Sequence, residues 1–100
     1  MIPTVRKIQK STAKAFGITA DELLSFDRHK RVCWPRQAAM HMARDLTNHS
    51  LPDIGRFFGG RDHATVLNAI KRVESRMRDF PEFAKAYRSA RSKALRGARQ

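Results

Sequence analysis

Apolar residues recur along this chain at the three- and four-residue spacing of amphipathic helices. The first residues that keep to this spacing are Val5, Ile8, Thr12, Ala15 and Phe16. Gly17 follows them as a stop signal, so the pattern predicts a helix from about Thr4 to Phe16. The other face of this helix is basic.

A capping box marks the start of a second helix. Thr19 and Glu22 stand in the T-x-x-E spacing in which each side chain satisfies a backbone N–H of the other, and two leucines follow. This predicts a short helix that ends near Phe26. The residues from Asp27 to Trp34 are then expected to form a flexible basic loop.

Proline is tolerated in the first turn of a helix, so Pro35 is predicted to begin a third helix that runs to about Thr47. Its apolar stripe consists of Ala39, Met42, Ala43 and Leu46. On the opposite side, Arg36, Arg44 and Asp45 are expected to stay solvated.

Residues 50–70, SLPDIGRFFGGRDHATVLNAI, have the form of two short helices joined by a glycine turn. Ser50 can cap the first helix and Pro52 is tolerated in its first turn. Gly59 and Gly60 supply the permissive backbone that a tight turn needs, and Asp62 can cap the second helix. A helix-turn-helix presents the first residues of its second helix to base edges, so this segment predicts a DNA-binding motif.

Two long amphipathic patterns complete the chain. The second motif helix is expected to point five residues toward the core and to end before Pro81: Val66, Leu67, Ile70, Val73 and Met77. In the last helix, over about residues 80–97, the expected apolar stripe is Phe83, Tyr87, Ala90 and Ala94. Its charged residues are Lys85, Arg88, Arg91, Lys93, Arg96 and Arg99, with no acid after Glu82. These charges fit three roles equally: a solvated face, a contact to phosphates, or a contact to an acidic protein.

The pattern therefore predicts an all-α fold, a compact domain of about six helices that contains a helix-turn-helix. One hundred residues suffice for one small domain with one core, so we expect a single domain over residues 1–100. No β-pattern, repeat or low-complexity tract appears.

The charge of the chain points to an anionic partner. Its 21 Lys and Arg face 9 Asp and Glu, which gives a formal net charge of +12. Nucleic acid is the leading candidate for the partner. An anionic membrane would also attract this charge, but no apolar run reaches the roughly 18 residues of a membrane span and no signal peptide opens the chain.

No residue set has the spacing of a catalytic or metal site. Cys33 is the only cysteine, which excludes an internal disulfide and a CxxC metal site and fits a cytosolic protein. The histidines at positions 29, 41, 49 and 63 are dispersed without an HExxH spacing. We therefore expect no metal, no cofactor and no enzymatic activity. Trp34 has two interpretations, a lid on the core or a ring that stacks on a base, and burial preference favours the lid.

From Leu46 to Val73, the string LTNHSLPDIGRFFGGRDHATVLNAIKRV closely resembles the C-terminal DNA-binding domain of the bacterial replication initiator DnaA. IQKSTAKAFGITADELLS, the basic loop and PRQAAMHMARDLTNHS also follow the family pattern, so the likeness covers roughly residues 8–73. GGRDHxTVL is highly specific for this family. The resemblance implies an all-helical, Trp-repressor-like helix-turn-helix domain that binds short asymmetric repeats of double-stranded DNA, the DnaA boxes of replication origins.

The resemblance also implies roles for individual residues. Asp62 and His63 align with residues that read bases in the major groove, and Arg28 aligns with a loop arginine that enters the minor groove. Ala64 stands where a threonine is usual, so it loses a hydroxyl but keeps a methyl that can touch a thymine methyl. Contacts to the DNA backbone are expected from Arg36, Gln37, Arg44, Thr47, Asn48, Leu51, Pro52, Arg61 and Thr65. For Arg61, a structural salt bridge is the alternative.

Other departures concern the loop and the length of the chain. Phe26 and Asp27 stand where basic residues are common in the family, and Trp34 replaces a small or basic residue. DnaA carries an ATPase domain ahead of this one, whereas this chain has no GxxxxGK[ST] loop, so we expect no nucleotide and no origin melting. The chain is either a free-standing relative of the domain or a piece of a longer protein.

We therefore expect sequence-specific binding to DnaA-box-like duplexes by a cytoplasmic, nucleoid-associated protein that regulates replication initiation or transcription. DnaA or another replication protein is a further candidate partner. Two alternatives stay open. One is a charge-driven nucleoid or RNA-binding protein, and the other is a protein-interaction module that uses Tyr87 and the arginines of the last helix.

Overall fold

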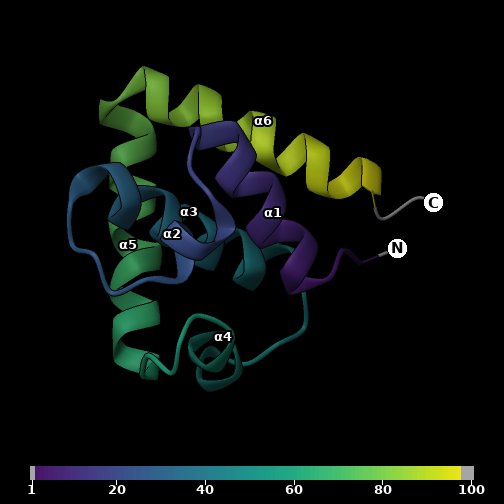
Figure 1. Cartoon of the computed structure of the whole chain (residues 1–100), viewed down its shortest axis with the longest axis vertical. Helices are drawn as coiled ribbons and strands as arrows, with labels where there is room; N and C mark the ends of the chain where they lie inside the picture. Colours follow the sequence, from purple (N-terminus) through teal and green to yellow (C-terminus); the bar gives the residue numbers. More distant parts are fainter. Residues whose placement is uncertain (1, 98–100) are drawn as a thin grey trace.

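The structure is a computed structural model that describes residues 2–97, and this part of the chain folds into helices joined by short connections (Figure 1). The helices are α1 (Val5–Phe16), α2 (Ala20–Leu24), α3 (Lys30–Leu46), α4 (Leu51–Phe57), α5 (His63–Asp79) and α6 (Pro81–Gly97). No strand occurs within residues 2–97. The predicted all-α class and the predicted number of helices are confirmed.

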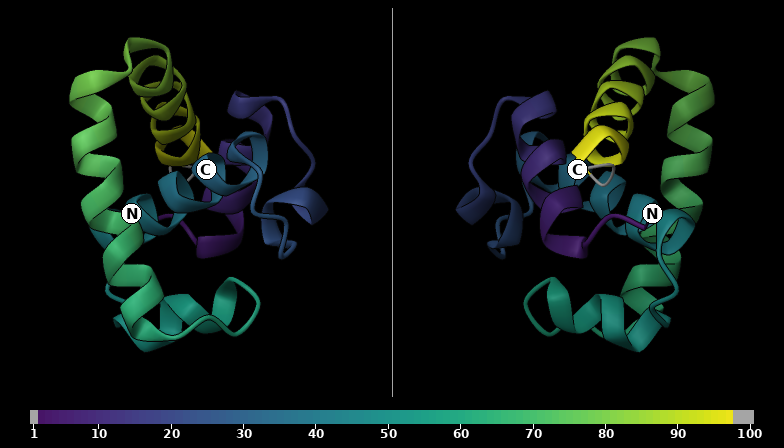
Figure 2. Two further views of the ribbon diagram at one scale, coloured as in Figure 1. Left: turned by 90° about the vertical axis from the view of Figure 1, so that its left-hand side faces the viewer. Right: turned by 90° about the vertical axis from the view of Figure 1, so that its right-hand side faces the viewer.

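Helix α3 lies at the centre of the fold, where α1 and α5 pack against it and α2 and α4 contact it (Figures 1 and 2). Helix α6 lies along α1 and also packs on α5. The side chains that fill the space between these helices are fully buried, among them Ile8, Met42, Ile54, Phe58 and Val73. Residues from every part of the chain thus share one core, which fixes α4 and α5 relative to α3.

Helix α1 has nearly its predicted bounds, and α6 buries its predicted apolar stripe. The Thr4 hydroxyl accepts a hydrogen bond from the Lys7 backbone N–H at 3.1 Å, and Gly17 ends α1 with a φ of 72°. The predicted apolar stripe of α6 is buried at all four positions, Phe83, Tyr87, Ala90 and Ala94. Arg99 lies outside the described residues. The periodicity of the sequence therefore identified the core faces of both helices.

On α5, one of the predicted core positions is wrong. Val66 and Val73 are fully buried, but Leu67 is 40% exposed. Ala69 and the stem of Arg76 occupy the buried positions instead. Successive residues on a helix are 100° apart, so a stripe that contains Val66 and Val73 turns Leu67 away from the core.

Helix α3 begins at Lys30, five residues before the predicted start at Pro35. Asp27 Oδ1 accepts a hydrogen bond from the His29 backbone N–H at 2.8 Å, and the His29 carbonyl accepts from Val32 and Cys33 at 2.9 and 2.8 Å. Pro35 cannot donate to the carbonyl four residues earlier, which costs about 3 kcal/mol inside a helix. Because Val32 is buried, its packing offsets about 1.5–3 kcal/mol of that cost and helps to hold the extra turn.

Candidate nucleic-acid interface

The first turn of α5 is capped and exposed. Asp62 Oδ1 accepts a hydrogen bond from the Thr65 backbone N–H at 2.9 Å, which confirms the predicted cap. This hydrogen bond lowers the pKa of Asp62, so its carboxylate stays ionised at neutral pH. His63, Ala64 and Thr65 are all exposed. The turn that the sequence predicts to read bases is therefore rigid in its backbone and open on its side chains.

A close backbone contact sets the angle between α4 and α5. Gly59 and Gly60 have φ values of 83° and 82°, as a tight glycine turn requires. The Gly55 carbonyl accepts hydrogen bonds from the N–H groups of Gly60 and Arg61 at 3.1 and 3.0 Å. A Cβ atom on Gly55 would lie 1.9 Å from the Arg61 carbonyl oxygen. Gly55, which the sequence analysis did not single out, thus lets the two motif helices meet.

The basic loop and α5 border one hollow of about 570 Å³. Its lining includes Arg28 from the loop, Thr65 and Arg72 from α5, and Arg36 and Arg61 between them, with no acidic residue. Arg28 is exposed, and no side-chain hydrogen bond or ion pair holds its guanidinium within residues 2–97. Of the four arginines that line it, Arg28 and Arg72 are exposed, and exposed arginine is well suited to bind phosphate oxygens. We call Arg28, the hollow and the exposed first turns of α5 the reading surface.

Arg36 is a correction to the sequence analysis, which expected a solvated side chain. It is only 4% exposed, and its guanidinium donates to the backbone carbonyls of Leu23 at 2.8 Å and Asp27 at 3.0 Å. Burial lowers the pKa of Arg36, yet the group stays charged at neutral pH. Arg36 therefore ties the end of α2 and the loop that carries Arg28 to the middle of α3.

Arg61 has a similar structural role. Its guanidinium donates to the Phe58 carbonyl and, at 2.7 Å, to the Ser25 carbonyl, and it stacks on the Phe26 ring at 4.7 Å. The partners are backbone carbonyls, so the salt bridge considered for Arg61 does not form within the described residues. Arg61 joins the helix-turn-helix to the same loop that Arg36 holds from the other side.

Residues 5–73 match the protein family described as the bacterial DnaA protein helix-turn-helix. The chain belongs to this family. Its membership makes it a DNA-binding domain of the helix-turn-helix class, as the resemblance implied. The reading surface lies within the matched residues, whereas all of α6 lies beyond them.

Similar proteins carry the name chromosomal replication initiator protein DnaA. The protein of Caulobacter vibrioides (strain NA1000 / CB15N) is 56% identical over 72 residues, which cover 72% of this chain and 15% of that protein. The protein of Caulobacter sp. (strain K31) is 51% identical over 78 residues, which cover 78% of this chain and 16% of that protein. The protein of Anaplasma marginale (strain St. Maries) is 49% identical over 81 residues, which cover 81% of this chain and 17% of that protein. The chain thus matches about one sixth of the length of these relatives.

The other residues that the DnaA resemblance places at the DNA backbone differ in exposure. Arg44, Asn48 and Pro52 are exposed. Gln37 accepts a hydrogen bond from Arg76 at 2.9 Å, and Thr47 donates its hydroxyl proton to the Ala43 carbonyl at 2.6 Å. Leu51 is partly buried against the core. The exposed members are free to approach phosphates, whereas the hydrogen-bonded members chiefly shape α3 and the start of α4.

The exposed face of α5 extends beyond the residues that the sequence analysis named. Leu67, Asn68, Lys71 and Arg72 are exposed, and they follow Ala64 at intervals of three, four, seven and eight residues. Side chains at these intervals share one face of a helix. The periodicity that predicted the buried stripe of α5 also indicates this face, because the exposed face lies on the opposite side of the helix from the stripe.

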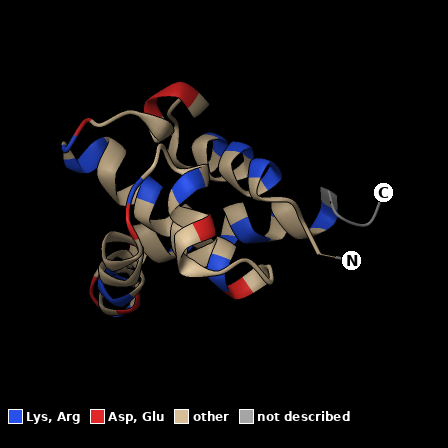
Figure 3. Ribbon diagram, turned by 90° about the horizontal axis from the view of Figure 1, so that it is seen from below, with Lys and Arg blue, Asp and Glu red and all other residues tan. Residues whose placement is uncertain are grey.

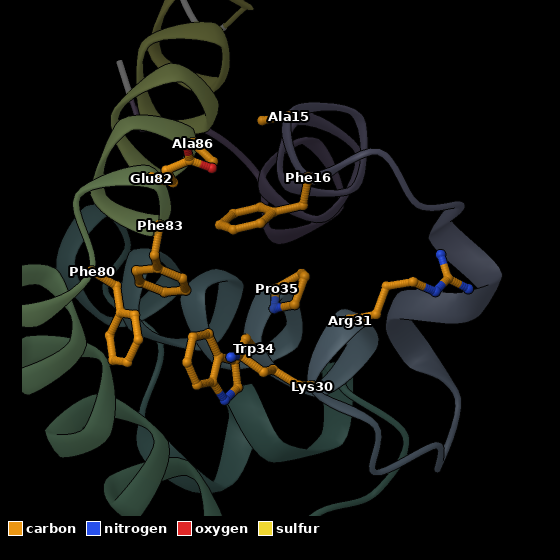
Figure 4. Close-up of a pocket in the computed structure, with 10 residues that line it drawn as sticks. All are labelled: Ala15, Phe16, Lys30, Arg31, Trp34, Pro35, Phe80, Glu82, Phe83 and Ala86. Carbon is orange, nitrogen blue, oxygen red and sulfur yellow. The ribbon is translucent and has the colours of Figure 1, made fainter.

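Trp34 is partly buried, packs against the core, and is not part of the lining of the hollow beside Arg28. Its ring meets those of Phe80 and Phe83 at 5.0 and 6.0 Å (Figure 4). Lys30 and Arg76 lie over the ring, 4.3 and 4.0 Å from its centroid. These rings and Phe16 line a separate, mostly apolar hollow of about 600 Å³ between α1, α3 and α6. The interpretation of Trp34 as a lid on the core is the one that the contacts support.

His41 and His49 are engaged in structural contacts. His41 shares a hydrogen bond of 2.7 Å with the Tyr87 hydroxyl, and the His49 ring packs on Phe57 at 5.0 Å. Within residues 2–97, no group of three His, Cys, Asp or Glu side chains has the arrangement of a metal site. Among the same residues, no helix has the length and apolar character needed to cross a membrane.

Proposed function

We propose that this domain binds double-stranded DNA sequence-specifically at DnaA-box-like sites. The observation that carries the proposal is the joint position of Arg28 and α5, which border the same acid-free hollow. In this arrangement α5 enters the major groove while Arg28 reaches the adjacent minor groove. Contacts in two neighbouring grooves define a longer and more selective site than one helix alone.

The proposed base contacts come from the exposed first turn of α5. Asp62 can accept from a cytosine amino group, His63 can bond to a base edge, and Ala64 can touch a thymine methyl. Arg28 favours the negative potential of a narrow A·T-rich minor groove. Exposed Arg44, Asn48 and Pro52 lie against the backbone and contribute affinity without selection.

The biological role that we propose is regulation of replication initiation or of transcription, in the cytoplasm at the nucleoid. The domain would occupy DnaA-box-like sites without an ATPase of its own, as one domain over residues 1–100. DnaA is then its competitor for the same sites. This role rests on the match to DnaA, of which the chain covers only 15–17%.

Base selection is tested by comparing two variants on two duplexes. His63→Ala is expected to lose about 1–3 kcal/mol of preference at defined base pairs and to bind a scrambled duplex almost as the parent does. Arg44→Met, a matched variant at an exposed backbone-contact residue, is expected to weaken both duplexes alike and to lower the salt slope by about one unit. Equal losses on both duplexes for His63→Ala would contradict the major-groove assignment.

The charge-driven alternative makes a different prediction. A nucleoid or RNA-binding protein that retains the motif only as a scaffold binds box-like and random duplexes with similar affinity. The capped and exposed first turn of α5 favours the sequence-specific function, since capping fixes the turn while leaving its side chains free.

A further inference from the structure

Most of the net charge of this chain lies away from the helix-turn-helix. Helices α1 and α6 together carry nine Lys and Arg and a single acid, Glu82, for a net +8 of the chain's +12. Helices α4 and α5 carry five Lys and Arg and three acids, for a net +2. Most of the attraction of this chain for anions therefore comes from surface outside the helix-turn-helix.

The charges of α1 and α6 point outward. All four exposed positions of α1 are basic: Arg6, Lys7, Lys10 and Lys14. On α6, Lys85, Arg88 and Arg96 are exposed and stand opposite the buried stripe. Arg91 pairs with Asp45 and is excluded from this set. We call the seven exposed residues the α1/α6 face.

This face and the reading surface lie on different sides of the molecule. Helix α1 begins, and α6 ends, on the side where both chain ends emerge, to the right in Figure 1, whereas α5 and the loop before α3 lie to the left. Lys85 and Arg88 lie in the first half of α6, which follows α5 directly, so the part of the face farthest from the reading surface is formed by α1 and Arg96. Seen from below, Figure 3 shows basic residues along the helices nearest the chain ends, and further basic residues on the side away from them. The molecule measures 34 × 29 × 24 Å, and a straight duplex that lies on the reading surface contacts one side of it.

We propose that the α1/α6 face binds the phosphate backbone of a second DNA duplex, without sequence selection. The domain would then bridge two DNA segments, one chosen by the reading surface and one held by charge. The bridging part of this inference rests on the proposed function, whereas the second surface does not.

The chemistry of the face favours a duplex over an anionic membrane. A helix that lies on a membrane inserts an apolar face into the lipid. The apolar faces of α1 and α6 are buried in the core, and the exposed large apolar residues of the described chain all lie outside these helices: Ile2, Phe26, Phe57, Leu67 and Phe80. Lys7 and Lys14 are about 10.5 Å apart along α1, a span over which one DNA strand presents about three phosphates.

A separate DNA segment is also favoured over the DNA that flanks the site bound by the reading surface. Bending a site of 20–30 base pairs by 40–90° already costs roughly 1–6 kcal/mol. Wrapping one duplex from the reading surface to the opposite side of the molecule requires a larger bend than that. A separate segment, or a distant part of the same molecule, meets the face without this cost.

A two-step capture experiment tests the proposal. An immobilised duplex with the preferred site is loaded with the protein, and the loading is measured directly. A labelled duplex of scrambled sequence is then added, and its capture is measured over a range of salt concentrations. The variant K7Q/K10Q/K14Q removes three charges from the α1/α6 face. The matched control K30Q/R31Q/R78Q removes three exposed charges outside both surfaces.

We expect the parent and the control to capture the second duplex. K7Q/K10Q/K14Q should load normally but capture at least about tenfold less, with a salt slope lower by about 2.7 because three phosphate contacts are lost. Capture that survives these substitutions, as in bridging by a dimer through two reading surfaces, would overturn the proposal. Normal loading of the parent on the immobilised duplex with no capture of the labelled duplex would also overturn the proposal. This holds even if the protein binds vesicles of phosphatidylglycerol, which would indicate a membrane as the partner of the face. Failure of the loading step itself instead contradicts the proposed function, and capture on a non-selective immobilised duplex then still tests the second surface.

Discussion

Replacing Arg36 by methionine separates a structural arginine from a phosphate-binding one. Methionine keeps most of the apolar stem but removes both hydrogen bonds, to the carbonyls of Leu23 and Asp27. Hydrogen bonds from a charged donor contribute about 1.5–3 kcal/mol each. Two of them amount to about 3–6 kcal/mol, and the desolvation of the guanidinium offsets part of this sum. We therefore expect a destabilisation of about 3 kcal/mol.

The assay is thermal unfolding followed by circular dichroism, together with DNA binding at a temperature where the variant is folded. A loss of about 3 kcal/mol lowers the Tm by roughly 12–24 °C for a domain of this size. Arg44→Met, on an exposed residue of the same helix, should change stability by less than about 0.5 kcal/mol. An unchanged Tm for Arg36→Met, with uniformly weaker binding to all duplexes, would refute the structural role.

Three further perturbations follow from the same contacts. Gly55→Ala puts a Cβ 1.9 Å from the Arg61 carbonyl oxygen, so we expect at least about 1–3 kcal/mol of destabilisation and loss of site preference; chemical denaturation and binding assays that match the parent would contradict this. Burial lowers the pKa of His41, so the contribution of His41 to the stability of the fold is present above the ordinary pKa of 6.5 and is lost as the pH falls below that value. A Tm difference between the parent and His41→Gln that does not shrink from pH 7 to pH 5 would contradict this role of His41. Arg28→Lys keeps the charge but should reduce preference for A·T pairs at one end of the site, and an unchanged selected motif would remove Arg28 from the minor groove.

Local signals in the sequence predicted much of the fold correctly. The caps at Thr19, Ser50 and Asp62 each depend on a side chain and a nearby N–H, so the sequence alone reveals them. The core stripe of α6 depends only on its period. The start of α3 was missed because Pro35 normally marks a first turn, and the turn before it is held by the packing of Val32, which no local rule contains.

The candidate site was predicted in part for the same reason. The first turn of α5 is exposed as its position in the motif implies, and the base contacts of Asp62, His63 and Ala64 stay predictions. The burial of Arg36 was not foreseen, because its partners lie 13 and 9 residues earlier in the chain. Gly55 was missed because only the approach of Arg61 reveals why it lacks a side chain.

The central claim is that this domain selects a DNA sequence through α5 and Arg28. The most direct measurement is selection of bound duplexes from a random pool at about 0.15 M salt, followed by the affinity ratio between the selected and a scrambled duplex. The account predicts one short asymmetric motif and a ratio of at least about 10³. No enriched motif, with a ratio near one, would contradict it.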